Sequence, residues 1–131
     1  MKKTKRVITI IIILSVILTG CTLTPQVEFD NFVTDLDLIN RFEEIAFNIE
    51  FGRNSETFQK GIKVLLQDLK SFESTNEKSM NINSKFIKSG QAFLDASKYY
   101  FEDQNANGEI SYQYGKTKYE EALLDFYAFV Q

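Results

Sequence analysis

Oxygen-bearing side chains recur at alternate positions within one short segment of the chain, residues 103–111. The segment is Asp103-Gln104-Asn105-Ala106-Asn107-Gly108-Glu109-Ile110-Ser111. Carboxylate, amide and backbone carbonyl oxygens are the ligands that a hard cation such as Ca²⁺ takes in proteins. One chemistry that these residue types and this spacing allow is therefore the binding of a calcium ion.

The spacing resembles the calcium loop of EF-hand proteins. That pattern implies these roles: side-chain oxygens from Asp103, Asn105 and Asn107, a sharp turn at Gly108, the backbone carbonyl of Glu109, a core contact from Ile110, and Ser111 as a ligand directly or through water. The chain departs from the family at the twelfth position, where Tyr114 stands in place of a bidentate glutamate. The alternative is a tight turn between two helices, with Gly108 at positive φ and Ser111 capping the second helix.

Residue types for catalysis are scarce. The chain has no histidine and a single cysteine, Cys21. This composition excludes a histidine base, Ser-His and Cys-His nucleophile pairs, histidine-ligated zinc and the histidine-containing di-iron site of helical bundles. The adjacent carboxylates Glu43-Glu44 and Glu120-Glu121 point about 100° apart on a helix, which is typical of a solvated face. We therefore expect a protein that is not an enzyme.

The first twenty residues have the pattern of a secretory signal peptide. A basic start with four Lys or Arg residues precedes an apolar run from Val7 to Leu18. At about 1.5 Å per residue, this run is roughly 18 Å long as a helix, whereas a bilayer core is about 30 Å thick. The length and the basic flank favour a cleaved leader over a permanent membrane span.

The end of this leader resembles the lipobox of bacterial lipoproteins. The motif is Leu18-Thr19-Gly20-Cys21, and it uses the only cysteine of the chain. The resemblance implies that a signal peptidase recognises Leu18, Thr19 and Gly20, that the chain is cut before Cys21, and that Cys21 carries the lipid. It also implies a location on the extracytoplasmic face of a cell membrane, where acyl chains hold the protein. The alternatives are an ordinary signal peptide or an uncleaved anchor.

The charge of the mature chain indicates its partners. The full chain has 15 basic and 18 acidic residues and a net charge of −3, and cleavage after Gly20 removes four basic residues and no acidic ones, so the net charge becomes −7. An acidic protein is not expected to bind nucleic acid, and an anionic lipid surface would repel it. Contact with the membrane should therefore depend on Cys21.

Four amphipathic helices are expected after the leader. Apolar residues at steps of three and four predict a first helix from Asp30 to Gly52, where Asp30 caps the start and Gly52 allows the left-handed turn at the end. The second has its stripe from Phe58 to Phe72, after a cap at Asn54 or Ser55. The third helix starts either at a Ser74-x-x-Glu77 capping box or nearer Asn81, and it ends at Phe101. Within it, Gly90 is either a place where a neighbouring helix packs closely or a locally weak point of the helix. The fourth covers residues 112–130.

These elements predict an all-α protein, a small up-down-up-down four-helix bundle. The expected organisation is a signal peptide over residues 1–20, a lipidated tether over 21–29, and a bundle domain over 30–131.

Two functions from different classes remain open. The first is a non-catalytic protein-interaction module that binds another envelope or surface protein. In build and location it resembles the small lipoproteins with which phages and conjugative elements block a second entry. The alternative is an extracytoplasmic binder of a ligand or of calcium, with no other cofactor expected, using the Asp103 segment or a cavity lined by tyrosines. The tyrosines that concentrate toward the C-terminal half are Tyr99, Tyr100, Tyr112, Tyr114, Tyr119 and Tyr127.

Overall fold

The computed structural model describes residues 22–131, and this part of the chain is helical throughout, with no strand. Its helices are α2 (Pro25–Asp35), α3 (Leu38–Glu50), α4 (Glu56–Lys70), α5 (Glu77–Phe101) and α6 (Asn105–Val130). The prediction of an all-α fold is therefore confirmed. The predicted signal peptide and Cys21 lie outside the described residues.

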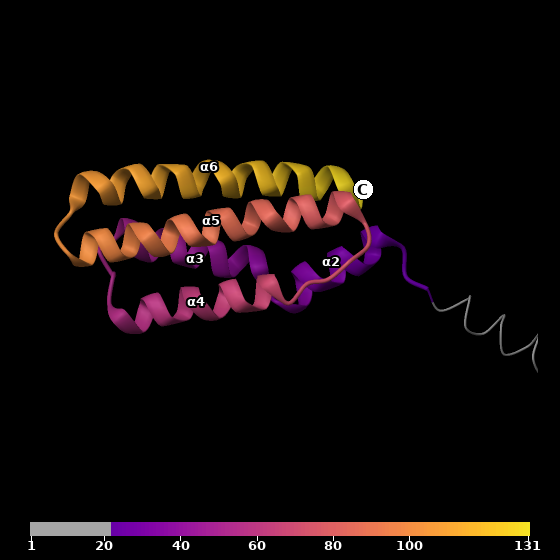
Figure 1. Cartoon of the computed structure of the whole chain (residues 1–131), viewed down its shortest axis with the longest axis horizontal. Helices are drawn as coiled ribbons and strands as arrows, with labels where there is room; N and C mark the ends of the chain where they lie inside the picture. Colours follow the sequence, from indigo (N-terminus) through magenta and orange to yellow (C-terminus); the bar gives the residue numbers. More distant parts are fainter. Residues whose placement is uncertain (1–21) are drawn as a thin grey trace, which may run out of the picture.

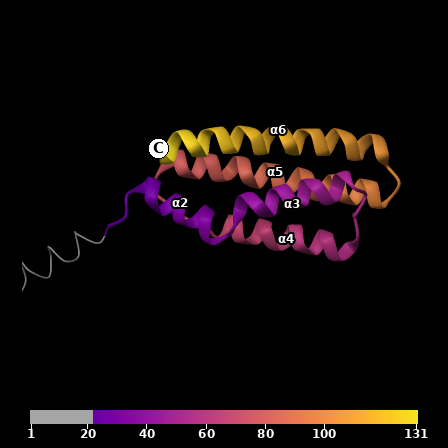
Figure 2. The ribbon, with the colours of Figure 1, turned by 180° about the vertical axis from the view of Figure 1, so that it is seen from behind.

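The helices form one elongated body in which α2 and α3 run in the same general direction, and α4, α5 and α6 then alternate (Figure 1). The two long helices α5 and α6 form the most extensive pair, α4 packs on α5, and α3 packs on both α5 and α6. The start of α2 and the C-terminus lie at one end of this body, and the α3–α4 and α5–α6 connections lie at the other, as the reverse view also shows (Figure 2). We call the end that holds these two connections the distal end.

The first predicted helix is two helices in the structure. Asp37 adopts a left-handed conformation with φ of 50°, which separates α2 from α3. The amides of Leu36 and Asp37 close the last turn of α2 on the carbonyls of Phe32 and Thr34, at 3.2 and 2.9 Å. Aspartate is among the residues that tolerate this conformation best, and the Asn40 side-chain amide donates a hydrogen bond of 2.7 Å to Asp37 Oδ1.

The start of α2 corrects the predicted tether. The helix begins at Pro25, where proline's fixed φ suits the first helical position, and Thr24 caps it by accepting a hydrogen bond from the Val27 amide. Phe29, at the end of the predicted tether, is completely buried between Phe72 and Phe126, at ring distances of 5.0 and 5.7 Å. Residues 25–29 are therefore part of the packed domain.

The remaining helix ends combine confirmed and wrong predictions. Ser55 caps α4 by accepting a hydrogen bond from the Phe58 amide, and Gly52 has the predicted left-handed conformation with φ of 74°. The capping box at Ser74 is wrong, because α5 is capped by Asn76, whose side chain accepts from the Ser79 amide at 2.9 Å. Ser74 instead accepts a hydrogen bond from the Asn76 amide.

Small residues let α5 and α6 approach closely. A Cβ atom on Gly115 would lie 2.8 Å from the Phe93 ring, and one on Gly108 would lie 2.9 Å from the Tyr100 ring. These two contacts are seven residues apart along each antiparallel helix, so aromatic rings of α5 sit on glycine backbone of α6 at heptad spacing. Gly90 likewise allows close packing, since its Cβ would meet Leu66 at 2.9 Å.

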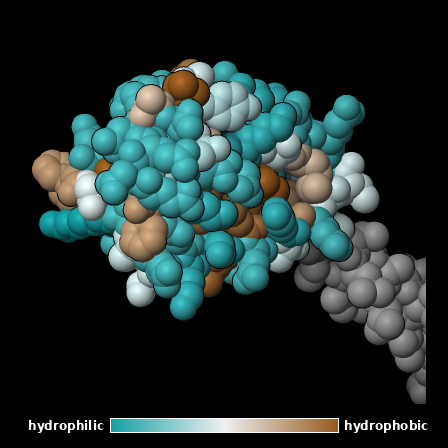
Figure 3. Space-filling view, turned by 60° about the vertical axis from the view of Figure 1, so that its left-hand side comes forward, coloured by the Kyte–Doolittle hydropathy of each residue, from teal (hydrophilic) through white to brown (hydrophobic). Residues whose placement is uncertain are grey.

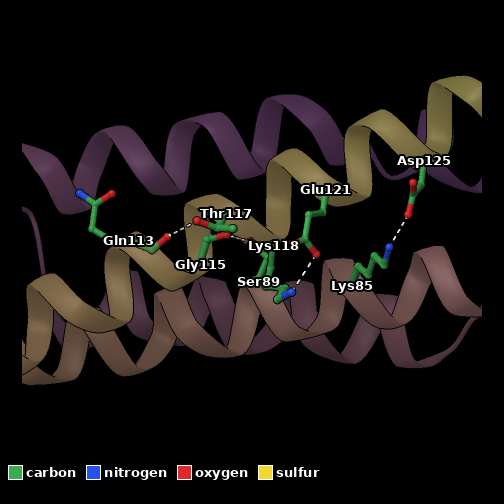
Figure 4. Close-up of polar contacts among 8 residues, drawn as sticks. All are labelled: Lys85, Ser89, Gln113, Gly115, Thr117, Lys118, Glu121 and Asp125. Atoms are coloured by element: carbon green, nitrogen blue, oxygen red, sulfur yellow. Dashed lines mark hydrogen bonds and ion pairs between the residues drawn. The ribbon is translucent and has the colours of Figure 1, made fainter.

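Polar contacts fix the register of the α5–α6 pair (Figure 4). The buried Ser89 hydroxyl donates a hydrogen bond of 2.7 Å to the Gly115 carbonyl, and Lys85 forms an ion pair with Asp125. Beside them, Lys118 forms an ion pair of 2.8 Å with Glu121 along α6. None of the helices over residues 22–131 combines the length and the apolar character that a membrane crossing needs.

Candidate functional site: a cleft at the distal end

The segment predicted as a calcium loop is mostly helix. Residues Asn105, Asn107, Glu109 and Ser111 lie within α6, and only residues 102–104 connect it to α5. Because each helical residue turns by about 100°, alternate residues point to nearly opposite sides and their oxygen atoms do not converge. The predicted loop is therefore wrong, and so is the alternative turn, since Gly108 is a helical residue packed against Tyr100. Over residues 22–131, no three His, Cys, Asp or Glu side chains gather where they could hold a metal.

The six tyrosines do not line one cavity. Tyr119 packs on the Phe42 ring at 5.0 Å and donates a hydrogen bond to the Ile39 carbonyl at 3.3 Å, so it belongs to the core. Burial raises its pKa, with Glu43 as a smaller cause. Tyr114 and Tyr127 are exposed, and Tyr99 is partly buried. Of the six, Tyr100 and Tyr112 line the same cavity.

This cavity is an open cleft of about 770 Å³ at the distal end. One wall comes from the end of α3 and the turn that follows it, and the other comes from the last turn of α5 and the first turns of α6. Each connection at this end contains one left-handed residue, Gly52 on one side and Asp103 with φ of 58° on the other. The chain therefore reverses direction within a few residues on both sides, and the helix ends stay close enough to enclose the cleft.

Glu109 is the best-held carboxylate of the cleft. Its Oε1 accepts a hydrogen bond of 2.8 Å from the Gln113 side chain, and its Oε2 accepts one of 2.9 Å from the Tyr100 hydroxyl. These two hydrogen bonds lower the pKa of Glu109, the bond from Gln113 contributing more. Burial, followed by the bond to Glu109, raises the pKa of Tyr100 to about 12. Tyr100 is therefore a neutral donor and Glu109 a charged acceptor at ordinary pH.

Tyr112 connects the two walls. Its hydroxyl lies 3.4 Å from Glu50 Oε2 and 3.5 Å from the Ala46 carbonyl, both on α3. Burial first, and then the negative charge of Glu50, raises the pKa of Tyr112. The Lys116 ammonium lies over the Tyr112 ring, 5.6 Å from its centroid. Aromatic rings attract cations in this geometry, so Lys116 is held at the wall of the cleft.

Asn54 lines the cleft without a partner for its side-chain oxygen. The residue is only 9% exposed, and its Oδ1 atom accepts no hydrogen bond within residues 22–131. Its backbone carbonyl is satisfied by the Gln59 side chain at 3.4 Å. Most buried polar groups in proteins have a partner, but this oxygen atom has almost no accessible surface, so it is an unpaired group inside the turn and not an open contact of the cleft.

Two exposed aromatic rings lie at the distal end, where Phe101 lines the cleft and Phe51, which follows α3, does not. Phe51 is 63% exposed and Phe101 is 55% exposed. The Phe51 ring packs on Phe47 at 4.3 Å, and the Arg53 guanidinium lies 5.8 Å from the Phe47 ring centroid. Figure 3, in which the distal end is brought forward, shows a mainly hydrophilic surface from which apolar side chains emerge separately.

Sequence reasoning identified only part of this site. Tyr100 and Tyr112 were expected near a cavity, and Glu109 was expected to act through its backbone carbonyl, whereas its side chain faces the cleft. Glu50, Arg53 and Asn54 gave no functional signal, since they look like ordinary residues of a helix end and a turn. Comparison of the chain with protein-family models, with curated proteins and with solved structures gives no match.

Proposed function

We propose that this protein is a membrane-anchored bacterial lipoprotein that acts as a non-catalytic protein-interaction module. The lipidated residue is Cys21, and the partner is another protein of the cell envelope or surface. The observation that carries the proposal is the distal cleft, with its ionised carboxylate Glu109 and the exposed ring of Phe101 in its lining. Exposed aromatic side chains around a polar cleft are typical of contact surfaces in protein complexes.

The position of the anchor supports this use of the cleft. Pro25, the first residue of α2, follows Cys21 by four residues, a distance of at most about 14 Å in extended chain. The cleft lies at the opposite end of the molecule, and α6 with its 26 residues is about 39 Å long. A chain held at Cys21 would thus keep the end that holds the start of α2 near the bilayer, and it would present the cleft away from the bilayer.

The fold suits a rigid spacer. In this proposal α2 and α3 together serve as one arm of an up-down-up-down four-helix bundle, with α4, α5 and α6 as the other three. The absence of histidine from the sequence, and the use of its only cysteine for lipid, support a role in binding without catalysis. A surface factor that blocks entry of phage or conjugative DNA by holding a component of the incoming machinery would have this build.

Recovery of the partner from native membranes tests the proposal. The full chain is crosslinked in its own membranes, and we compare the wild type with Phe101→Ser, because Phe101 is exposed and lines the cleft. Leu124→Ser is the matched control, because Leu124 is 72% exposed and lies on α6 outside the cleft. We expect one stoichiometric protein partner with the wild type and the control, and its loss with Phe101→Ser. A partner retained by all variants, or none recovered at all, would refute the proposed role of the cleft.

A second candidate is a binder of a small molecule. Ligand pockets in proteins commonly measure about 300–1,000 Å³, and the volume of the cleft falls in that range. Native mass spectrometry of the full chain from its own membranes distinguishes the two candidates. A bound molecule that is lost on Tyr112→Ala and kept on Leu124→Ala would favour this second function.

A further inference from the structure

A groove runs between α3 and α4, which both pack on α5 more closely than on each other. Its volume is about 350 Å³, and apolar side chains line most of it: Ile45 from α3, and Phe58, Ile62, Val64 and Leu65 from α4. Val64 is half exposed, and the neighbouring Gly61 leaves open space, because an added Cβ would meet nothing within 4 Å. The groove therefore leaves one side of the helix packing open to a further element.

Exposed aromatic rings extend this surface toward the distal end. Phe51 continues the hydrogen-bond pattern of α3, since its amide donates to the Phe47 carbonyl at 3.0 Å. It follows Glu44, which lines the groove, by about two helical turns, so both residues lie on the same side of α3. The Phe47 and Phe51 rings are exposed and pack on each other at 4.3 Å. An apolar groove that continues into exposed rings is typical of a surface that another protein covers.

The two helices that flank the groove carry opposite charges. The exposed charged residues of α3 are all acidic, namely Glu43, Glu44 and Glu50. Those of α4 are basic except for Glu56, namely Lys60, Lys63 and Lys70. None of these residues belongs to an ion pair within residues 22–131, where the pair that joins α3 to α4 is Arg41–Asp68. The acidic and the basic side of the groove are therefore unpaired within the described part of one copy.

The unpaired charges nearest the groove lie at similar heights along it. Lys60 precedes the groove residue Val64 by about one helical turn, so the two lie on the same side of α4. Glu44 lies six residues before the end of α3, and Lys60 lies four residues after the start of α4. At about 1.5 Å per residue, they are about 9 and about 6 Å from the distal ends of their helices. We call the groove, together with Glu44, Phe47, Phe51 and Lys60, the α3–α4 face.

Twofold symmetry allows a second copy to cover this face in two ways. An axis perpendicular to the helices would lay α3 on α3 and α4 on α4, so that like charges would repel each other. An axis parallel to the helices lays α3 of one copy on α4 of the other, and acidic side chains then meet basic ones on both sides of the axis. The distribution of charge therefore favours the parallel axis.

We infer that a second copy of this chain docks on the α3–α4 face, with the twofold axis parallel to the helices and with Glu44 of each copy paired to Lys60 of the other. The same axis places both starts of α2 at one end and both distal clefts at the other (Figure 1). Two copies held by their anchors would thus stand on one bilayer, and this orientation rests on the proposed function. The contact between the faces does not rest on it, because it depends on the groove and its charges alone.

The size of the face indicates a weak dimer that the membrane supports. The helices α3 and α4 have 13 and 15 residues and are about 20 and about 23 Å long. Two such helices from each copy make a small interface compared with the roughly 1,200–2,000 Å² that stable complexes bury. Attachment to one surface raises the effective concentration of the second copy, which compensates for a small interface.

Energy transfer between labelled copies tests the inference. The full chain carries a donor or an acceptor fluorophore at its C-terminus and is reconstituted at low density in phosphatidylcholine vesicles. We expect transfer with the wild type, and association at least about tenfold weaker with Glu44→Lys or Lys60→Glu alone, because the symmetry applies each like-charge contact twice. Glu73→Lys is the matched control, since Glu73 is an exposed carboxylate after α4 that does not line the groove. This control should keep the transfer of the wild type.

A mixture of the two charge variants locates the contact. When Glu44→Lys carries the donor and Lys60→Glu carries the acceptor, each lysine again faces a glutamate, so the transfer should return. A variant that had merely lost its fold could not regain association in this way. If the chain does not attach to vesicles, the proposed anchor fails, and the same set is measured in solution at about millimolar protein, where weak contacts of roughly 10⁻³ M are populated.

Other outcomes overturn the inference. Absence of transfer with the wild type in both settings, or equal transfer with all variants, would show that the charges of α3 and α4 do not join two copies. Loss with the single variants without recovery in the mixture would refute the pairing of Glu44 with Lys60. If an envelope partner depends on Phe101 while the wild type shows no transfer, the dimer is refuted and the proposed function stands. If the transfer follows the charges but no partner is recovered, the proposed function fails and the dimer stands.

Discussion

Gly115→Ala should destabilise the protein, whereas the same change at Gly61 should stabilise it. The added Cβ at position 115 would lie 2.8 and 2.9 Å from two atoms of the Phe93 ring. Carbon atoms prefer about 3.5–4.0 Å, and Phe93 is fully buried against Phe42 and Tyr112, so the ring has no free space to enter. At Gly61 an added Cβ would meet nothing within 4 Å.

The two variants separate packing from helix propensity. Both glycines lie inside helices, where alanine is favoured over glycine by about 1 kcal/mol. At Gly61 this gain stands alone, so the free energy of unfolding should rise by about 0.5–1 kcal/mol. At Gly115, overpacking costs about 1–3 kcal/mol, and any shift of α6 also strains the hydrogen bond from Ser89 to the Gly115 carbonyl. The difference between the two variants, in which the propensity cancels, should therefore be about 1–3 kcal/mol.

Urea unfolding of both variants, followed by circular dichroism, measures this difference. The midpoint should move to lower urea for Gly115→Ala and to higher urea for Gly61→Ala, with an unchanged slope. Thermal midpoints should separate by roughly 4–8 °C for each kcal/mol in a domain of this size. If the two alanine variants shift by the same amount in the same direction, the close α5–α6 contact at Gly115 is refuted.

Three further outcomes follow from individual residues. Phe29→Ala should lower the free energy of unfolding by about 3–5 kcal/mol, measured in urea, because the ring is fully buried. Val27→Ala, at an exposed position of the same helix, should lower it little. Equally small losses for both variants would mean that residues 25–29 are a tether after all. Ser55→Ala should cost about 1 kcal/mol by removing the cap of α4, and no loss would contradict that cap. Tyr100 has its pKa raised from 10.0 to about 12, so the folded state keeps a proton that the unfolded state loses, and the free energy of unfolding should fall as the pH rises through this interval. The free energy of unfolding of Tyr100→Phe should fall less steeply over this pH interval. Identical pH profiles of the wild type and the variant would contradict the raised pKa.

The helices with clear apolar stripes were predictable from the sequence. In α4 the stripe of Ile62, Leu65 and Leu69 is completely buried, and in α5 Phe86 and Phe93 face the core. Hydrophobic burial dominates the folding free energy, so a regular stripe specifies which face of a helix is inside. The apolar stripe of the first predicted helix could not show the break at Asp37, because Val33 before the break and Leu38 after it are both buried.

The start of α6 was misjudged because turn chemistry and tertiary packing disagree there. Asn and Gly residues at 105–108 favour a turn by local preference. In the fold, however, Gly108 is the position where α6 touches the Tyr100 ring, and a larger residue would clash with it. The glycine therefore serves close packing between helices, which a single sequence does not distinguish from a turn.

The cleft was largely beyond sequence reasoning. Its polar residues come from separate segments of the chain, with Glu50 at the end of α3, Asn54 in the following turn and Glu109 in the first turns of α6. They meet because two chain reversals, at Gly52 and Asp103, lie at the same end of the molecule. The sequence predicted the reversal at Gly52, but it contained no signal that these three side chains would share one space.

The most direct test of the whole account is photocrosslinking from the rim of the cleft in living cells. A photoreactive phenylalanine analogue is placed at position 101, and at position 124 as the control, in the wild-type chain and in a Cys21→Ser chain. The account predicts a single envelope-protein adduct from position 101 that is absent from position 124 and is lost when Cys21 is replaced. An equal adduct from both positions, or one that persists with undiminished yield in the Cys21→Ser chain, would contradict an anchored module that presents its cleft to a partner.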